Sequence, residues 1–487
     1  MANATSLQLQ LDRMQAEMQD SIDTVWLLFN GALVFFMQCG FGMLEAGAVK
    51  SKSTQNIMLK NLFDASIGGI LWWLIGYGIK NEAGNAFMGI APSGVNGQSK
   101  FATSDLMLAG AGESTGSAWA LVFFEFTFAA ASSTIVSGAV AERAQLPAYL
   151  FFTSLITGII YPTIAHWVWS PVGWLSYLNK KDALLGGVID FAGSGCVHLT
   201  GGIAAVIGAA ITGPRTGRFD QATGAVVPMP GHSPVLQVLG TFILWLGWYG
   251  FNAGSTMTIN AKLAPTAGRI HLTTTLGACG GGICAVVLER YRGKRRTWDA
   301  VAMCNGILAG LVSVTAGCAT IPPWAALMVG VAGAGIYRVA SKVLLQCKVD
   351  DPLDAFAVHG ACGLWGLLAC ALFTTPEFAK SVAGLDHAGL FSSKPGGELL
   401  VAALVLIAAQ IAFVGSLSVI VFLGLKKMKL LRVSLEDEMA TGAIVAKQMA
   451  DMDGSTYRGQ MYAPTSVVTD TSVAAAQINV TTADGNA

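Results

Sequence analysis

The chain has 487 residues, of which 53% are hydrophobic and 12% are charged, and its 29 basic side chains balance 29 acidic ones. An average soluble domain carries about 25% charged residues, so this chain has roughly half the charge that covers a water-soluble globule. The composition therefore excludes a string of soluble domains, although the length alone would allow about three of them.

Apolar runs of membrane length recur along the whole chain. A helix that crosses the roughly 30 Å hydrocarbon core needs about 20 mainly apolar residues, and the lack of period-two alternation favours helices over barrel strands. The sequence thus predicts an all-α integral membrane protein with about eleven transmembrane helices. The expected spans are residues 24–46, 60–79, 118–140, 147–169, 188–212, 234–252, 268–288, 299–318, 321–340, 354–374 and 398–425.

Three regions follow from these spans. We expect residues 1–23 to form an extracellular N-terminal segment, residues 24–430 the membrane domain, and residues 431–487 a cytoplasmic regulatory tail, disordered after about residue 465. One set of alternate connections, together with the tail, holds 17 Lys and Arg residues, whereas the other set holds 8. Because basic residues concentrate on the cytoplasmic side, we expect the N-terminus outside and the tail in the cytoplasm. The start of the chain does not read as a cleaved signal peptide, and Asn3 begins a glycosylation sequon on the predicted outer side.

Glycine is abundant, with 58 residues. Helices in lipid associate through close backbone packing, which glycine at helical spacing permits. We expect such contacts at Gly277, at Gly281 with Gly282, and at Gly330 with Gly335. The pattern predicts a compact bundle of many helices.

Two histidines lie at membrane depth, where each ionisable residue is a functional candidate. His198 follows Asp190, and His359 follows Asp354, in similar surroundings five spans apart. With an odd number of helices per repeat, this spacing predicts an inverted five-plus-five repeat followed by a last long helix, and brings equivalent positions together near the midplane. A weak sequence similarity between residues 40–47 and residues 247–254 supports the repeat. A lone intramembrane histidine more often joins two helices, but a symmetry-related pair flanked by glycine favours a polar strip in an apolar conduit.

Aromatic residues gather at the ends of several spans. Trp and Tyr at such ends usually form interfacial belts, which is the alternative reading of each residue taken alone. Several rings with a hydroxyl at an outer mouth would instead hold a small cation by cation–π attraction. The residues in question are Trp169, Phe124, Phe128, Trp248, Phe251 and Ser255.

Other classes of site find no support in the sequence. The nine cysteines form no CxxC pair and no cluster with histidine at metal spacing, so no metal and no cofactor is expected. No Ser, Cys or carboxylate lies at a spacing that suggests a nucleophile with the histidines, so an enzyme is not expected. We also expect no nucleic-acid partner.

At the two histidines and the aromatic residues described above, the sequence resembles the ammonium transporter family. Within that family it resembles the Amt/Mep branch and, more narrowly, the plant type. The run from Asp190 through His198 to Arg215 matches the family signature over about 26 positions. Further blocks occur in family order, at residues 135–143, 161–169, 248–255 and 350–360. The resemblance covers roughly residues 24–460, so residues 24–430 would form the eleven-helix transporter domain.

The resemblance implies a homotrimer in a plasma membrane, each subunit with its own narrow pore for ammonium or ammonia. Trp169 and Ser255 would bind ammonium at the outer vestibule, Phe128 and Phe251 would stack below as a gate, and His198 and His359 would line the pore. Trp248 and Phe124 would belong to the same outer site. Asp190, with Asp354 as its counterpart, would act structurally and electrostatically without touching the substrate.

Two departures from the family pattern concern regulation and recruitment. Glu125 falls where many relatives have a neutral residue, and it either faces the vestibule and concentrates cations or lies protonated between helices. In the tail, an apparent insertion around residues 442–447 disturbs the alignment with plant-type relatives, in which a threonine is phosphorylated. Ser455 or Thr456 would be the equivalent phosphosite for a kinase or another regulator.

These features lead to one main functional hypothesis and one alternative. The main hypothesis is an ammonium transporter with cation recruitment at an aromatic outer site and conduction past twin histidines. The alternative is an ammonium sensor that signals through its cytoplasmic tail with little flux. Whether transport moves net charge stays open at this point.

Overall fold

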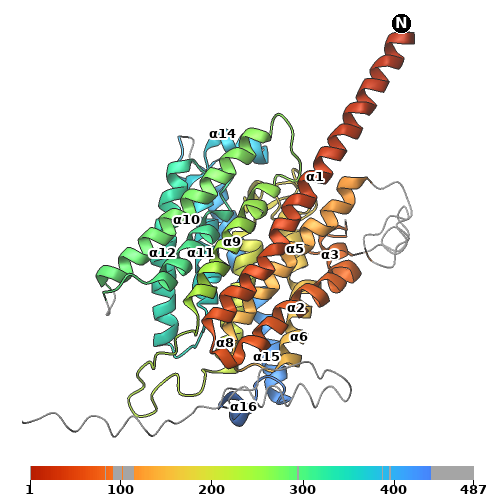
Figure 1. Ribbon diagram of the computed structural model, residues 1–487. Helices are drawn as coiled ribbons and strands as arrows, with labels where there is room; N and C mark the ends of the chain where they lie inside the picture. The colour runs from red at the N-terminus through yellow and green to blue at the C-terminus, as the bar shows by residue number, and fades with distance from the viewer. Residues whose placement is uncertain are drawn as a thin grey trace, which may run out of the picture. The chain divides into compact units, whose positions relative to one another are not determined.

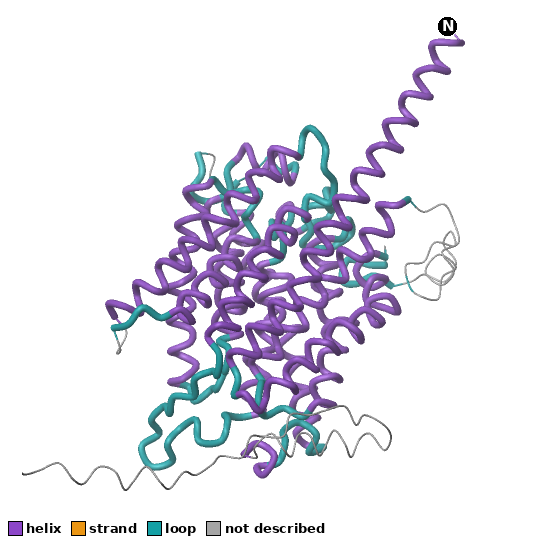
Figure 2. The backbone as a smooth tube through the Cα atoms, in the orientation of Figure 1, coloured by secondary structure: helices purple, strands orange, loops and turns teal. Residues whose placement is uncertain are grey.

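The computed structural model describes residues 2–82, 84–90, 101, 115–292, 296–386, 388–393 and 396–439. Over these residues the chain is helical, with isolated β-bridges in place of strands (Figure 2). The predicted all-α membrane class is therefore confirmed. The predicted disordered end of the tail, with Ser455 and Thr456, lies outside the described residues.

Within the described residues, ten helical segments are long and apolar enough to cross a membrane, and the shorter apolar helix α11 falls on the remaining predicted span (Figure 1). Several spans combine an α-helix with a π-helical turn. In chain order the elements are α1 (Ala2–Ala48), α2 (Thr54–Leu71) with η2 (Trp72–Gly76) and α3 (Tyr77–Asn81), α5 (Gly116–Ala139), α6 (Leu146–Leu155) with η3 (Ile156–Ile160) and α7 (Tyr161–Trp169), η5 (Ser194–Leu199) with α8 (Thr200–Thr212), α9 (Pro234–Gly254), α10 (Ala264–Arg292), α11 (Ala300–Thr315), α12 (Pro323–Gln346), η6 (Phe356–Ala361) with α13 (Cys362–Phe373), and α15 (Glu398–Lys427). Short helices follow at α14 (Pro376–Phe378), before α15, and at α16 (Leu435–Met439), after it.

The first helix is much longer than the apolar run that predicted it. Helix α1 begins at Ala2 rather than near residue 24, and it extends beyond its neighbours at the N-terminal end (Figure 1). The added turns carry polar pairs at i, i+4, such as Arg13 with Glu17 at 2.9 Å, which stabilise a helix without any burial. Hydropathy marks only the apolar part of a helix, so it missed this extension.

Glycine allows the helices to approach each other closely, as predicted. A Cβ atom at Gly310 or Gly330 would lie 2.1 Å from the carbonyl oxygen of Gly277, so α10, α11 and α12 are in backbone contact there. A Cβ at Gly281 would lie 2.2 Å from Gly306 O, and one at Gly282 would meet the Ile307 side chain at 2.6 Å. Gly335 is the exception, because a Cβ there would meet nothing within 4 Å.

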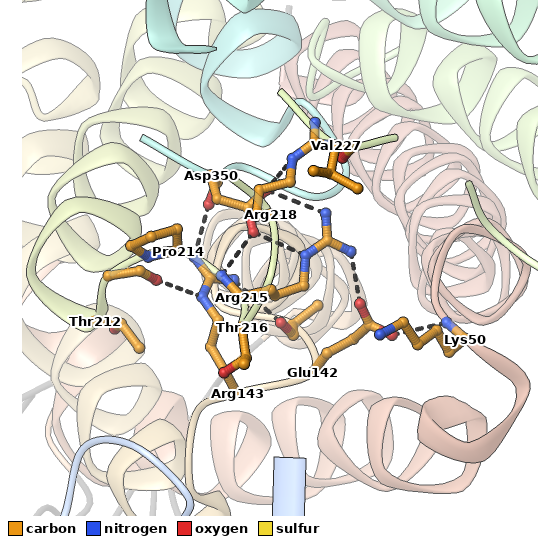
Figure 3. A network of polar contacts seen from close by, with 12 residues as sticks. Lys50, Glu142, Arg143, Thr212, Pro214, Arg215, Thr216, Arg218, Val227 and Asp350 are labelled. Carbon is orange, nitrogen blue, oxygen red and sulfur yellow. Dashed lines mark hydrogen bonds and ion pairs between the residues drawn. The ribbon is translucent and has the colours of Figure 1, made fainter. Parts of the chain in front are cut away.

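An ion-pair network joins three connections at one end of the bundle (Figure 3). The Arg215 Nε lies 2.8 Å from Asp350 Oδ2, and its Nη1 lies 2.6 Å from Glu142 Oε2. Arg218 Nε pairs with the other Asp350 oxygen at 3.1 Å, and Arg143 donates to the Asp350 carbonyl oxygen at 2.6 Å. The Asp350 carboxylate thereby joins the connections after α8 and α12, and the connection after α5 is held through Arg215 and the Asp350 backbone. Burial would raise the pKa of Asp350, but hydrogen bonds and attraction from Arg215 outweigh it and hold the pKa below its ordinary value.

Replacing Asp350 by Asn is expected to destabilise the protein by about 3 kcal/mol, because losing one partner of a buried ion pair leaves the other charge uncompensated. The Arg215 side chain is only 5% exposed. The measurement is the thermal unfolding of purified protein in detergent. Asp386→Asn is the matched control, since Asp386 pairs with Lys380 at the surface and its side chain is 87% exposed.

The same comparison has an expected pH dependence. A carboxylate whose pKa is lowered by folding contributes stability above its unfolded pKa of about 4, and this contribution is lost as the pH falls through the lowered value. The difference in melting temperature between the wild type and Asp350→Asn should therefore narrow below about pH 4. A constant difference down to pH 2 would contradict the assignment.

Candidate functional site

An aromatic cavity of about 560 Å³ lies between the ends of several helices. Four of the residues predicted for the outer site, from α5, α7 and the end of α9, line this cavity: Phe124, Phe128, Trp169 and Ser255. The Trp169 Nε1 donates to the carbonyl oxygen of Asp190 at 2.8 Å, which fixes the indole. The Ser255 hydroxyl donates to the Phe251 carbonyl oxygen at 2.8 Å, so its oxygen can still accept a hydrogen bond.

Phe128 lines the aromatic cavity, whereas Phe251, which the sequence also placed at the outer site, does not line it and lies behind Phe128. Phe128 and Phe251 stack with ring centroids 4.0 Å apart and an interplanar angle of 21°. Trp169 meets Phe128 edge-on, at 6.1 Å and 84°. Phe251 is fully buried, and its ring centroid lies 5.5 Å from that of His198. The rings thus form a continuous series from the cavity to the histidine.

The two histidines meet, as the repeat predicts. Nδ1 of His198 lies 3.2 Å from Nδ1 of His359, and the rings stack at 5.3 Å. One imidazole donates and the other accepts in such a contact, so the tautomers are complementary. Among the described residues, no hydrogen-bond partner reaches His198 Nε2. A second space of about 20 Å³, here called the histidine cavity, lies beside His359 and is also lined by Phe41 and Glu45.

Close backbone contact makes this meeting of the histidines possible. A Cβ atom at Gly202 would lie 2.3 Å from the Cα of Gly360. Each histidine sits in a π-helical turn, η5 or η6, that begins its span. π-turns are rare and often mark functional sites. In both halves of the chain, therefore, a π-helical turn at the start of the span carries the histidine.

Trp248 lies elsewhere than predicted. It is buried beside the histidines, with its ring 5.0 Å from that of His198 and an interplanar angle of 12°. Its Nε1 donates to Thr315 Oγ1 at 2.8 Å. It does not line the aromatic cavity, because it lies about two helical turns deeper on α9 than Ser255.

The carboxylate that corresponds to Asp190 is Asp351 rather than Asp354. Asp190 accepts hydrogen bonds from the backbone N–H groups of Gly193, Gly195 and Cys196, at 3.2, 3.0 and 2.8 Å. Asp351 accepts in the same way from the N–H of Phe356 at 2.8 Å, and each of the two carboxylates lies eight residues before its histidine.

Asp354 makes contacts of a different kind. Its carboxylate accepts hydrogen bonds from Ser341 Oγ at 2.6 Å, from the Tyr337 hydroxyl at 3.2 Å and from Asn305 Nδ2 at 3.3 Å. It ties α11 and α12 to the start of η6. Matching by residue type alone selected Asp354, whereas the distance to the histidine would have selected Asp351.

Two acidic residues near the cavities have partners that the sequence did not reveal. Glu125 lines the aromatic cavity and forms a salt bridge with Lys80, so neither earlier interpretation of Glu125 describes it fully. Glu45 lines the histidine cavity and accepts a hydrogen bond from Asn61 Nδ2 at 2.6 Å. In the sequence, residues 40–47 stood out only for their similarity to residues 247–254. The charge of Glu45 inside an apolar run would have been enough to mark it as a candidate.

Comparisons with known proteins agree with this geometry. A model described as the Ammonium Transporter Family matches residues 25–450. The chain belongs to the ammonium transporter family. It is 40% identical over 444 residues to ammonium transporter 1 member 3 of Solanum lycopersicum, covering 88% of this chain and 92% of that protein. It is 42% identical over 414 residues to ammonium transporter 1 member 1 of Arabidopsis thaliana, covering 82% and 79%.

Solved structures of the ammonium transporter family share the fold. A structure named Sensor Amt Protein has a TM-score of 0.74 and 30% identity, covering 86% of this chain and 97% of that one. The crystal structure of Candida albicans Mep2 also has a TM-score of 0.74, with 27% identity and coverage of 90% and 93%. The resemblance inferred from the sequence motifs is therefore confirmed.

Replacing Asp190 by Asn is expected to lower the melting temperature clearly, corresponding to about 2–4 kcal/mol. The three N–H groups at η5 would lose a charged acceptor, and hydrogen bonds to charged groups contribute about 1.5–3 kcal/mol each. Thermal unfolding in detergent measures the effect. Asp182→Asn, at an exposed site in the preceding connection, is the control and should melt like the wild type. An unchanged melting temperature for Asp190→Asn would show that these bonds add no net stability.

Proposed function

We propose that this protein transports ammonium across a membrane, through one pore in each subunit that runs from the aromatic cavity past His198 and His359. The observation that carries the proposal is the continuous series of rings, in which Phe128 stacks on Phe251, Phe251 contacts His198, and His198 meets His359. Membership of the ammonium transporter family supports the choice of substrate.

Recruitment takes place in the aromatic cavity. Ammonium and potassium ions are similar in size, so charge and radius alone select poorly between them. The faces of Trp169 and Phe128 attract a cation, and Ser255 offers a hydroxyl oxygen that accepts a hydrogen bond. Of the two ions, only ammonium donates hydrogen bonds, so a site that replaces part of its hydration in this way favours ammonium.

Conduction follows from the cost of moving an ion into an apolar space. An ion entering the ring stack would lose hydration that apolar side chains do not replace, whereas neutral ammonia loses far less. Ammonium therefore transfers its proton to water on the aromatic-cavity side of Phe128 and Phe251, where there is room for several water molecules, and neutral ammonia passes the histidine pair. Neutral imidazoles suit this step, because one ring nitrogen donates and the other accepts.

The remaining assignments concern assembly, orientation and the tail. The protein is a homotrimer in the plasma membrane with its N-terminus outside and its C-terminus in the cytoplasm. The start of the tail is anchored on the bundle: Glu438 accepts from the Thr216 N–H at 2.7 Å and pairs with Arg432 at 2.8 Å. This anchoring supports a regulatory tail, on which a kinase would act at Ser455 or Thr456.

Ammonium uptake in a yeast strain that lacks its own ammonium transporters tests the transport proposal. Expression of the wild type should rescue growth on low ammonium. The double variant His198→Ala/His359→Ala should reduce methylammonium uptake at least tenfold and should lose selectivity, while the oligomer still assembles. His271→Ala is the control, because His271 lies on an exposed part of α10 and should transport normally.

Two outcomes of this experiment would count against the proposal, and a separate current recording would decide whether transport moves net charge. No rescue by a correctly located wild-type oligomer would favour the sensor alternative. Unchanged flux and selectivity in the double variant would remove the histidines from the pathway. A current recorded on ammonium addition would show that transport moves net charge, and its absence alongside uptake would show electroneutral transport.

Replacing Trp169 by Leu is expected to raise the half-saturation concentration for ammonium about threefold to tenfold, because the indole face that attracts the cation is lost. Expression should stay normal, since Trp169 is only partly buried. The measurement is the concentration dependence of methylammonium uptake. Trp324→Leu, at a side chain 62% exposed on α12, should leave the kinetics unchanged. Equal kinetics in both variants would remove Trp169 from recruitment.

A further inference from the structure

A buried ion pair forms part of the wall of the aromatic cavity. Lys80, in α3, forms a salt bridge with Glu125, in α5, and the two side chains are 4% and 6% exposed. The second Glu125 oxygen accepts from Asn81 Nδ2 at 2.6 Å. Both charged residues line the same cavity as Trp169 and Ser255. The pair thus belongs to the recruitment site without being one of its aromatic or hydroxyl groups.

The end of α3 that carries Lys80 is held firmly. His166, which is fully buried on α7, places Nδ1 at 2.7 Å from the carbonyl oxygen of Lys80 and Nε2 at 2.8 Å from that of Asn85. The same short helix therefore presents both Lys80 and Asn81 to one carboxylate. Because both partners of Glu125 come from one fixed segment, the carboxylate is fully engaged by the protein.

The charges around the aromatic cavity can be counted over the residues that the structure describes. They are Asp23, Lys80 and Glu125. Asp23 lies on α1 and accepts from the Thr258 hydroxyl at 2.7 Å and from the Ile259 N–H at 3.0 Å. Lys80 cancels the charge of Glu125, which leaves the cavity with one net negative charge in place of two.

A free carboxylate in this wall would attract every monovalent cation. The attraction depends on charge and distance, so it would act on potassium as strongly as on ammonium and would weaken the selectivity of the aromatic faces. The Lys80 side chain ends in a primary ammonium group, which has the charge and the hydrogen-bond donors of the substrate. It therefore occupies the carboxylate as a tethered equivalent of the transported ion.

We propose that the Lys80–Glu125 pair determines cation specificity at the recruitment site, with Lys80 preventing Glu125 from acting as a second, unselective cation site. This inference rests on the proposed transport function. It assigns Glu125 and Lys80 opposite effects on cation affinity, which a purely structural ion pair would not have.

Four proteins test the pair by uptake kinetics: the wild type, Glu125→Gln, Lys80→Met and the double variant. Glu125→Gln leaves Lys80 uncompensated beside the site, so the half-saturation concentration for methylammonium should rise about tenfold. Lys80→Met frees the carboxylate, so this concentration should fall and potassium should become a competitor. In the double variant, the half-saturation concentration for methylammonium and the strength of potassium competition should both return to within about threefold of the wild type.

Two further variants separate specificity from folding and from overall charge. Lys80→Arg keeps a positive charge beside Glu125, so potassium should not become a competitor in this variant, whatever its maximal uptake. Lys380→Met removes a lysine whose side chain is 64% exposed in another connection and should leave potassium competition unchanged. If both single variants and the double variant lose maximal uptake alike, without opposite shifts in half-saturation, the pair is structural and the proposal is wrong.

A binding measurement keeps this test independent of transport. In purified protein, potassium chloride should raise the melting temperature of Lys80→Met more than that of the wild type, with N-methylglucamine chloride, whose bulky cation does not fit beside the carboxylate, as the reference at the same ionic strength. If the wild type does not transport ammonium but this potassium effect is present, the transport proposal fails and the role of the pair stands. Equal potassium effects in both proteins would overturn the role assigned to Lys80.

Discussion

The contact between Gly202 and Gly360 is the constraint on which the rest of the site depends. No side chain fits between the two backbones at this point, so the crossing admits only glycine. The crossing brings the π-helical turns η5 and η6 together, and these turns carry His198 and His359. A carboxylate fixes each π-helical turn by accepting hydrogen bonds from backbone N–H groups. Asp190 does this for η5, and Asp351 does it for η6. The spacing of the histidines is therefore set by backbone packing and not by their own hydrogen bond.

The bilayer imposes a second demand, and the buried carboxylate of Asp64 meets it through partners on neighbouring helices. Asp64 on α2 accepts hydrogen bonds from Thr134 and Ser133 on α5 at 3.1 and 3.3 Å, and also from the Tyr149 hydroxyl. The Lys60 ammonium lies 5.1 Å above the Tyr149 ring. Polar groups without water must find partners inside the protein. This polar seam between α2, α5 and α6 therefore holds helices together as well as carrying charge.

Much of the fold could be predicted from the sequence, because the signals were strong and local. The spans follow from runs of apolar residues, and the meeting of the histidines follows from an inverted repeat. The extension of α1 was missed because helix formation by polar i, i+4 pairs leaves no hydropathy signal. The positions of Trp248 and Asp351 were missed because residue type was matched without regard to turn position. The salt bridge between Lys80 and Glu125 joins residues 45 positions apart, so it depends on how α3 meets α5.

The two cavities beside the ring series differ greatly in size, and this has a consequence for proton exchange. A space of about 10–15 Å³ is enough for one water molecule, so the histidine cavity of about 20 Å³ has room for roughly one, whereas the aromatic cavity of about 560 Å³ has room for many. A solute on the aromatic side can exchange protons with a hydrated cluster. In the proposed pathway, the space beside His359 has Glu45 in its wall and room for about one water molecule. The two ends of the proposed pathway thus differ in how many water molecules can share a proton, even though the backbone around the histidines is built by the same repeat.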